Sequence, residues 1–270
     1  MQLKKDVILG VIIGDIAGSR FELKNNKYGK KFEFLHKFCR YTDDSVMTPA
    51  VAKAFLETKD DYSNFEENVI NSMTEVGRKY PRCGYGPSFY RWIMSEDHKP
   101  YGSFGNGSAM RISAVGVVAK SIDEVKRLSA IVTNVSHNHP DSINVSEASA
   151  VAIYMALDGK SKDEIKKYIE TNYFKIDDLK INTMKPKYFH INCIETVKQS
   201  IGVFLESTDF EDAIRNAIAL GGDSDTIGTI TGSIASAFYG VPEDISKKAL
   251  EYLDDYLIKI HDDFNAKYMW

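Results

Sequence analysis

The chain is poor in cysteine and carries little net charge. Its three thiols, Cys39, Cys83 and Cys193, form neither a Cys-x-x-Cys pair nor an even set. A disulfide framework is therefore not expected, and we expect a reducing, cytoplasmic setting. The net charge of −4 at pH 7 gives no electrostatic basis for binding nucleic acid or an anionic membrane.

Long hydrophobic runs are also missing. The apolar run that begins at Val7 stops at Asp15, far short of the roughly 20 residues of a membrane-spanning helix. Lys4 and Lys5 precede this run as in a signal peptide, but Asp6 interrupts its start. The segment is therefore predicted to be a buried helix.

Neither linkers nor the signatures of acyl transfer occur. The chain has no Gly-x-Ser-x-Gly elbow and no cysteine with a helper residue, so nucleophilic acyl transfer is not expected. It also lacks a tract rich in Pro, Gly or Ser and any sequence repeat. The length suits one large domain or two small ones; without a linker, we predict a single domain over residues 1–270.

Helical periodicity dominates the remaining sequence. Short alternating stretches near 30–38 and 172–190 are the expected loops or small hairpins. Capping boxes are predicted at Ser63 with Glu66 and at Ser161 with Glu164. We therefore predict one all-α domain of about ten helices. The predicted helices cover residues 6–18, 44–57, 63–79, 108–119, 122–134, 141–157, 161–171, 192–206, 209–220, 226–239 and 243–264.

Small residues recur every four positions on two of these helices. Each glycine costs a helix interior roughly 0.5–1 kcal/mol relative to alanine, so this spacing predicts close backbone approach in a central layer. The first face holds Gly10, Gly14 and Gly18, and the second holds Gly228, Gly232, Ser236 and Gly240.

Two acidic clusters lie next to these helices. The first is Thr42-Asp43-Asp44-Ser45, and the second is Gly221-Gly222-Asp223-Ser224-Asp225-Thr226. Either cluster alone is also a good helix N-cap. Both together favour a metal site, because like charges brought into contact need a cation between them. Hard oxygen ligands favour magnesium, manganese or calcium over zinc.

Pro49 conflicts with a helix that starts at Asp44, because proline removes a hydrogen bond and clashes with the preceding turn. Two alternatives follow. The helix kinks at Pro49, or it starts at Thr48 with Pro49 in the first position and leaves residues 42–45 on a tighter turn.

A glycine-rich loop, Tyr101 to Arg111, opens another helix and is suited to an anion such as phosphate, although it also fits a simple turn. Phe104 in this loop either stacks on a base or anchors the loop in the core. Ser136-His137-Asn138-His139-Pro140 lacks the further ligands of a zinc site. We expect one histidine to donate to a ligand oxygen and the other to bond the backbone. Glu22 either steers a substrate hydroxyl or water, or pairs with Arg20 or Lys24.

Taken in order, these motifs resemble the ADP-ribosylglycohydrolase family over nearly the whole chain. The resemblance rests on Gly14-Asp15 through Gly18-Ser19 to Glu22, on the first acidic cluster, on Gly102 to Arg111, on Ser136-His137 and on the second acidic cluster. It implies a compact, orthogonal multi-helix domain with two magnesium ions, replaceable by manganese, in a central cleft. It further implies hydrolysis at the anomeric carbon of ADP-ribose carried by a protein side chain or another acceptor.

The resemblance also implies roles for single residues. The metal ligands would be Thr42, Asp43, Asp44, Asp223, Asp225 and Thr226. Glu22, Asp43, Asp44 and Asp225 would be the catalytic carboxylates, with Glu22 near the distal ribose. The substrate would also contact Gly102, Ser103, Phe104, Gly105, Asn106 and His137.

Three alternatives remain open from the residues alone. The chain could bind ADP-ribose or a nucleotide without turnover, act as a two-metal phosphohydrolase on the diphosphate, or be a two-carboxylate glycosidase without metal. The acid count favours a metal enzyme over the last of these. Nucleic acid is expected only as an ADP-ribosylated substrate, and the linkage cleaved, the base and the oligomeric state stay open.

Overall fold

The computed structural model describes residues 3–22, 29–176 and 191–269, and in these ranges it confirms the all-α prediction. No strand occurs in the described residues, and only two isolated bridges join extended segments. The α-helices are α1 (Val7–Gly18), α2 (Asp43–Glu57), α3 (Phe65–Lys79), α4 (Pro87–Met94), α5 (Ser113–Val118), α6 (Ile122–Asn134), α7 (Pro140–Leu157), α8 (Lys162–Asn172), α9 (Cys193–Glu206), α10 (Phe210–Leu220), α11 (Ser224–Tyr239), α12 (Glu243–Leu250) and α13 (Asp255–Tyr268). A short 3-10 helix, η1, covers Asn106–Ser108.

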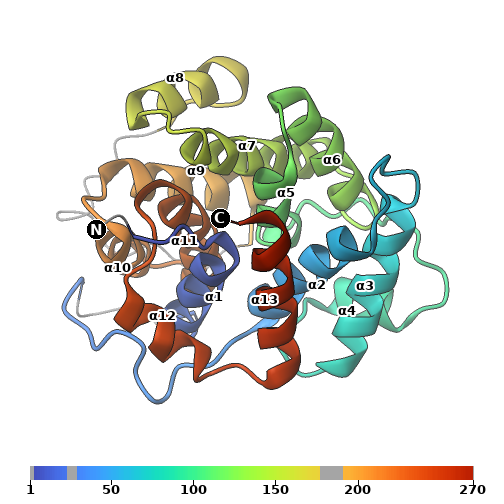
Figure 1. The fold of residues 1–270 in the computed structure, drawn as a ribbon, viewed down its shortest axis with the longest axis horizontal. Coiled ribbons are helices and arrows are strands. Elements are labelled where there is room, and N and C mark those ends of the chain that lie inside the picture. Colours follow the sequence, from blue (N-terminus) through green and yellow to red (C-terminus); the bar gives the residue numbers. More distant parts are fainter. Residues whose placement is uncertain (1–2, 23–28, 177–190, 270) are drawn as a thin grey trace.

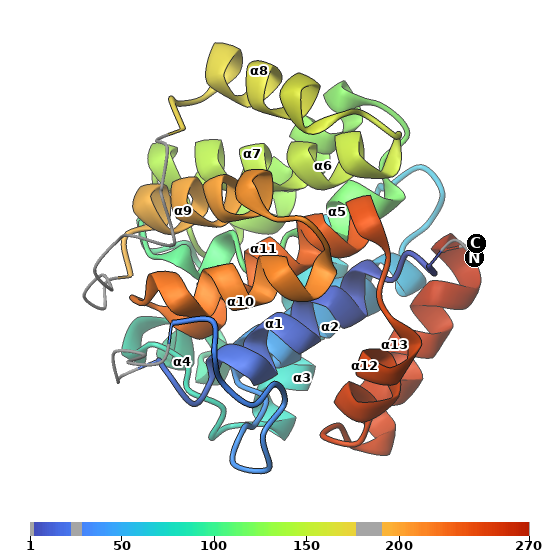
Figure 2. The ribbon, with the colours of Figure 1, turned by 90° about the vertical axis from the view of Figure 1, so that its left-hand side faces the viewer.

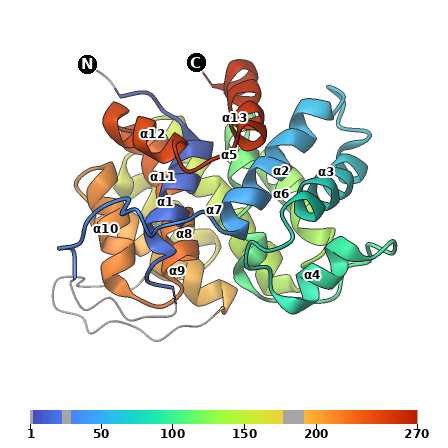
Figure 3. The same cartoon turned by 90° about the horizontal axis from the view of Figure 1, so that it is seen from below.

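Helices α1 and α11 form the centre of the molecule (Figures 1, 2 and 3). Every residue of α1 is buried, so the apolar run of the sequence is a central helix. Helices α2, α3 and α4 lie to one side of this pair, and α10 lies to the other (Figure 3). No helix of the described residues is both long and apolar enough to cross a membrane.

The small residues explain how α1 and α11 pack. A methyl group on Gly14 would overlap the carbonyl of Gly228, and one on Gly18 would overlap the backbone of Ser224. Gly10 meets the other end of α11, so the two helices run antiparallel. Gly240 does not extend this face: it ends α11 with a φ of +80°. The antiparallel packing places the end of α1 beside the start of α11.

Local capping signals set several helix ends. Ser161 and Glu164 form the predicted capping box of α8. The box predicted at Ser63 is wrong, because α3 begins after Asn64 and no side chain caps it. Ser63 instead donates its backbone N–H to Asp61, which places it in the preceding turn.

Other helix boundaries differ from the prediction. Helix α4 was not predicted, and residues 243–264 form two helices, α12 and α13, because Asp254 caps a new helix start. Residues 29–38 form turns and bends without strand pairing. Of the stretch 172–190, residues 177–190 lie outside the described ranges.

Pro49 lies inside α2, which runs from Asp43 to Glu57, so of the two alternatives the start at Thr48 is wrong. The earlier start is stabilised from outside the helix. Thr42 accepts a hydrogen bond from the N–H of Asp44, and Asp15 on α1 accepts one from the N–H of Ser45. These acceptors satisfy N–H groups that a first turn leaves unpaired.

Candidate active site

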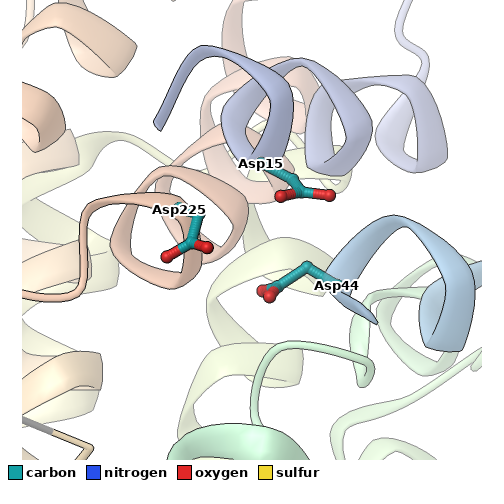
Figure 4. Close-up of side chains that lie close together, drawn as sticks. All are labelled: Asp15, Asp44 and Asp225. Carbon is teal, nitrogen blue, oxygen red and sulfur yellow. The ribbon is translucent and has the colours of Figure 1, made fainter. Parts of the chain in front are cut away.

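Three helix ends meet at one place and bring the two acidic clusters together. Asp15 lies near the end of α1, Asp44 in the first turn of α2 and Asp225 in the first turn of α11. Their side chains project from three helices into the space between them (Figure 4). One carboxylate oxygen of each lies within 4.8 Å of the others. Glu22, Asp223 and Asp225 form a second group within the same limit.

Asp15 was not predicted to be a site residue, although it was part of the motif that begins at Gly14. It is fully buried, and both of its oxygens are used. Oδ1 accepts from the hydroxyl of Thr42 at 2.7 Å, and Oδ2 accepts from the N–H groups of Thr42 at 2.8 Å and Ser45 at 3.1 Å. The signal in the sequence was an acid within a fully apolar helix, where a carboxylate needs a partner.

Burial and mutual repulsion raise the pKa values of the carboxylates. Burial, followed by the charge of Asp15, raises the pKa of Asp43 to about 8. Burial and the charges of Asp15 and Asp43 hold the pKa of Asp44 well above its usual value. Burial and the charge of Asp223, then that of Asp44, do the same for Asp225. Each ionised carboxylate of this cluster therefore disfavours the ionisation of its neighbours.

The donor set fits a divalent cation. The Oδ1 atom of Asp44 is buried and has no hydrogen-bond partner in the described part of the chain. The hydroxyls of Thr42 and Thr226 each lie 3.4 Å from Oδ2, the other carboxylate oxygen of Asp44. Two helix N-termini, those of α2 and α11, also face the cluster and favour negative charge there. The ligand atoms offered are oxygens only, as Mg²⁺ and Mn²⁺ prefer.

The acids form one wall of a cleft of about 400 Å³. Its lining includes Glu22, Asp43, Asp44, Ser103, Gly105, Asn106, Gly107, His137, Asp223, Asp225 and Thr226. The cleft therefore joins residues that are up to 204 positions apart, from Glu22 to Thr226.

The glycine-rich loop reaches this cleft only in part. Ser103, Gly105 and Asn106 line it, whereas Gly102 and Phe104 do not. Gly102 has a φ of +67° and donates its N–H to the side chain of Asn138, so it shapes the loop. Phe104 is 54% exposed, which excludes the core anchor and leaves its ring accessible.

Asn106 has a contact that the sequence did not predict. Its side-chain amide donates to Oδ2 of Asp223 at 2.7 Å, so the loop is tied directly to the second acidic cluster. Its backbone N–H donates to the carbonyl of Ile191 at 3.1 Å. Asn106 thus positions a carboxylate, in addition to lining the cleft.

The two histidines have separate places. His139 caps α7 and accepts from the backbone N–H of Asp141 at 3.2 Å. His137 is buried and lines the cleft. His139 thus bonds the backbone, as expected of one histidine, while donation from His137 to a ligand oxygen stays a prediction.

Glu22 lies in the cleft wall and forms no ion pair with Arg20, whose guanidinium instead lies over the ring of Phe21. Lys24, the other expected partner, lies outside the described residues. Partial burial, then the charge of Asp223, raises the pKa of Glu22. Such a carboxyl is suited to exchanging a proton with a substrate hydroxyl or water.

Comparisons of the sequence and of the fold with known proteins identify relatives of this chain. The family model described as ADP-ribosylglycohydrolase matches residues 5–269. The ADP-ribosylhydrolase ARH3 of Xenopus tropicalis is 25% identical, with 86% of each chain covered. The ADP-ribosylarginine hydrolase Tri1 of Pseudomonas putida (strain GB-1) is 23% identical, covering 91% of this chain and 74% of the relative.

A solved structure described as an ADP-ribosylglycohydrolase-related protein complex has the same fold. It superposes with a TM-score of 0.74 at 20% sequence identity, covering 97% of this chain and 95% of the other.

Proposed function

The chain belongs to the ADP-ribosylglycohydrolase family, and we propose that it hydrolyses the glycosidic bond at the anomeric carbon of ADP-ribose carried by a protein side chain. One observation supports this most strongly. Two acidic clusters that lie far apart in the sequence converge on one wall of a cleft that a glycine-rich loop also lines. Intact ADP-ribose and the free acceptor would be the products.

We further propose that the cluster holds two Mg²⁺ ions, with Mn²⁺ as a substitute. Thr42, Asp43, Asp44, Asp223, Asp225 and Thr226 would hold them, and the partnerless oxygen of Asp44 supports this. When bound, the ions would polarise ribose hydroxyls and water and offset negative charge during bond cleavage. Asp15 would orient Thr42, and Asn106 would orient Asp223, as outer-shell partners do in metal sites.

Different residues of the cleft would contact the two ends of the substrate. Ser103, Gly105 and His137 would contact the diphosphate side, while Glu22 would hold a hydroxyl of the distal ribose. The cleavage would develop positive charge on the ribose ring, as in other glycoside hydrolysis, and the surrounding carboxylates would stabilise it. One of Glu22, Asp43, Asp44 and Asp225 would accept the proton of the attacking water.

The test is product release from peptides that carry mono-ADP-ribose on arginine or on serine, with Mg²⁺ and with a chelator. Magnesium-dependent release of intact ADP-ribose, identified by mass, supports the proposal and shows which linkage is preferred. AMP and ribose phosphate would instead indicate a phosphohydrolase. Binding of ADP-ribose without release from either peptide would indicate a binding protein, and both of these results would overturn the proposal.

A further inference from the structure

A fully buried arginine, Arg111, lies behind the cleft. Its Nη1 donates to the carbonyl of Gly107 at 3.0 Å, and its Nη2 donates to the hydroxyl of Ser136 at 2.7 Å and to the carbonyl of Val132 at 3.3 Å. Its guanidinium also lies 5.2 Å from the centre of the Phe89 ring. Within the described ranges no carboxylate pairs with it, so its hydrogen bonds, and not an ion pair, determine what it does.

The hydroxyl of Ser136 links Arg111 to His137. Its Oγ lies 2.8 Å from Nδ1 of His137. Because a guanidinium can only donate, this oxygen accepts from Arg111 and has one hydrogen of its own to place. Ser136 is completely buried, and among the described residues Nδ1 is the one acceptor within reach of that hydrogen. The hydroxyl therefore donates to Nδ1, which leaves the ring proton on Nε2.

The opposite tautomer is disfavoured on the same grounds. A proton on Nδ1 would make Ser136 accept two hydrogen bonds and leave its own hydrogen buried without an acceptor, which costs free energy. Donation from a cation to Ser136 also strengthens the next donation in the chain. Burial, then the charge of Arg111, holds the pKa of His137 well below its usual value. The ring is accordingly neutral, with one N–H.

His137 and Gly107 both line the cleft, and Nε2, not Nδ1, is the ring nitrogen next to Gly107. Nε2 of His137 has no hydrogen-bond partner in the described part of the chain, and a methyl group on Gly107 would lie 3.3 Å from it. The ring is held between Tyr101, 5.5 Å away, and Phe89, 6.0 Å away, measured between ring centres. These two contacts restrict rotation of the imidazole ring and so keep the direction of Nε2 fixed.

We infer that Arg111 and Ser136 are positioning residues that fix His137 as the Nε2–H tautomer, and so make it a hydrogen-bond donor to an acceptor oxygen of the ligand, as a phosphate supplies. The identity of the ligand rests on the proposed function, whereas the tautomer does not. In the opposite tautomer Nε2 would present a lone pair to the ligand and would repel an anion.

The first experiment records the ¹⁵N ring resonances of His137 in the ligand-free protein, because one-bond and two-bond couplings distinguish the tautomers. We expect the Nε2–H form in the wild type and a mixture in Ser136→Ala. Ser129→Ala is the matched control, since Ser129 is equally buried and its hydroxyl has no partner in the described residues. The Nδ1–H form in the wild type, or an unchanged tautomer in Ser136→Ala, would overturn the inference.

The second experiment measures ADP-ribose affinity by calorimetry. A mixture of tautomers leaves only part of the protein in the Nε2–H form, which predicts a Kd about 2- to 10-fold weaker in Ser136→Ala, with Ser129→Ala unchanged. If hydrolysis is observed, KM should rise by the same factor at constant kcat. His137→Gln, whose amide nitrogen can replace Nε2–H, should bind more tightly than His137→Asn, whose amide replaces Nδ1. The reverse order would contradict the inference, even if hydrolysis is not found.

Discussion

Both carboxylate oxygens of Asp15 accept hydrogen bonds from Thr42, one from its hydroxyl at 2.7 Å and one from its backbone N–H at 2.8 Å. These hydrogen bonds connect the central helix α1 to the N-terminus of α2. Because the hydroxyl donates to Asp15, its lone pairs are directed elsewhere, and Asp44 Oδ2 lies 3.4 Å from it. Asp15 therefore sets both the start of the helix and the direction of the free lone pairs of the Thr42 hydroxyl.

We predict that Asp15→Asn weakens Mg²⁺ binding by about 10- to 100-fold, as loss of an outer-shell partner does. The new amide would place a donor against an N–H or hydroxyl of Thr42. Calorimetric titration with Mg²⁺ measures the change without any substrate. Asp209→Asn, at the cap of α10, is the control that should leave the affinity unchanged. Wild-type affinity in Asp15→Asn would remove Asp15 from the metal model.

A second prediction concerns Asp225, and its effects on activity and on stability have opposite signs. Asp225→Asn should lower magnesium-dependent activity by more than about 100-fold, because a direct ligand matters more than an outer-shell one. In a chelator the same variant should unfold at a higher temperature than the wild type, because one of several mutually repelling buried carboxylates is gone. Calorimetric melting with and without Mg²⁺ checks this. Retained activity at saturating Mg²⁺ would refute the ligand assignment.

The sequence predicted which helices pack closely together, but not whether those helices run parallel or antiparallel. The four-residue spacing of Gly10 and Gly14 correctly indicated close packing, as did that of Gly228 and Gly232. Spacing does not reveal whether two helices run parallel or antiparallel, and only the antiparallel arrangement brings Glu22 to Asp225. Whether the acidic residues meet therefore depends on the relative orientation of the two helices. The local sequence pattern does not show this orientation.

Two site features had little or no local signal. Asp15 is a single acid within an apolar helix, and nothing in its neighbours shows that the first turn of another helix supplies its hydrogen bonds. The contact from Asn106 to Asp223 spans 117 residues and arises from the loop conformation. By contrast, the acidic clusters and His137 were found because each lies in a short motif of polar and small residues.

A third prediction tests the packing of the central pair. Gly14→Ala should lower the free energy of unfolding by at least about 1–3 kcal/mol, because the added methyl meets the backbone of Gly228 and no flexible side chain. Gly86→Ala, where a methyl meets nothing within 4 Å, is the matched control. Urea unfolding followed by circular dichroism measures both. Equal stability of the two variants would contradict the backbone contact.

The last prediction concerns a buried ion pair far from the acidic cluster. Asp6 caps α1, and His261 of α13 approaches its Oδ2 with Nε2 at 3.0 Å, while the amide of Asn265 donates to the same oxygen at 2.9 Å. Burial alone would lower the pKa of His261, but the hydrogen bonds and charges of Asp6 and then of Asp262 outweigh it and raise that pKa. Burial would likewise raise the pKa of Asp6, but His261 and the N–H of Leu9 lower it.

The two shifts define a pH window. The raised pKa of His261 contributes stability that is complete below its unfolded value of about 6.5 and is lost as the pH rises through the folded value. The lowered pKa of Asp6 contributes stability above about 3.9 that is lost as the pH falls through its folded value. The pair therefore stabilises the protein most between about pH 4 and 6.5.

A double-mutant cycle with Asp6→Asn and His261→Gln isolates this pair from the other titrating carboxylates, because their contributions cancel in the difference. We expect a coupling free energy of about 1.5–3 kcal/mol at pH 5.5, the range for hydrogen bonds to charged groups, and a smaller one at pH 9. Urea unfolding at the two pH values measures it. A coupling that stayed constant or grew toward pH 9 would show that His261 is neutral in the folded protein. Helix α13 would then be held to α1 by hydrogen bonds without charge.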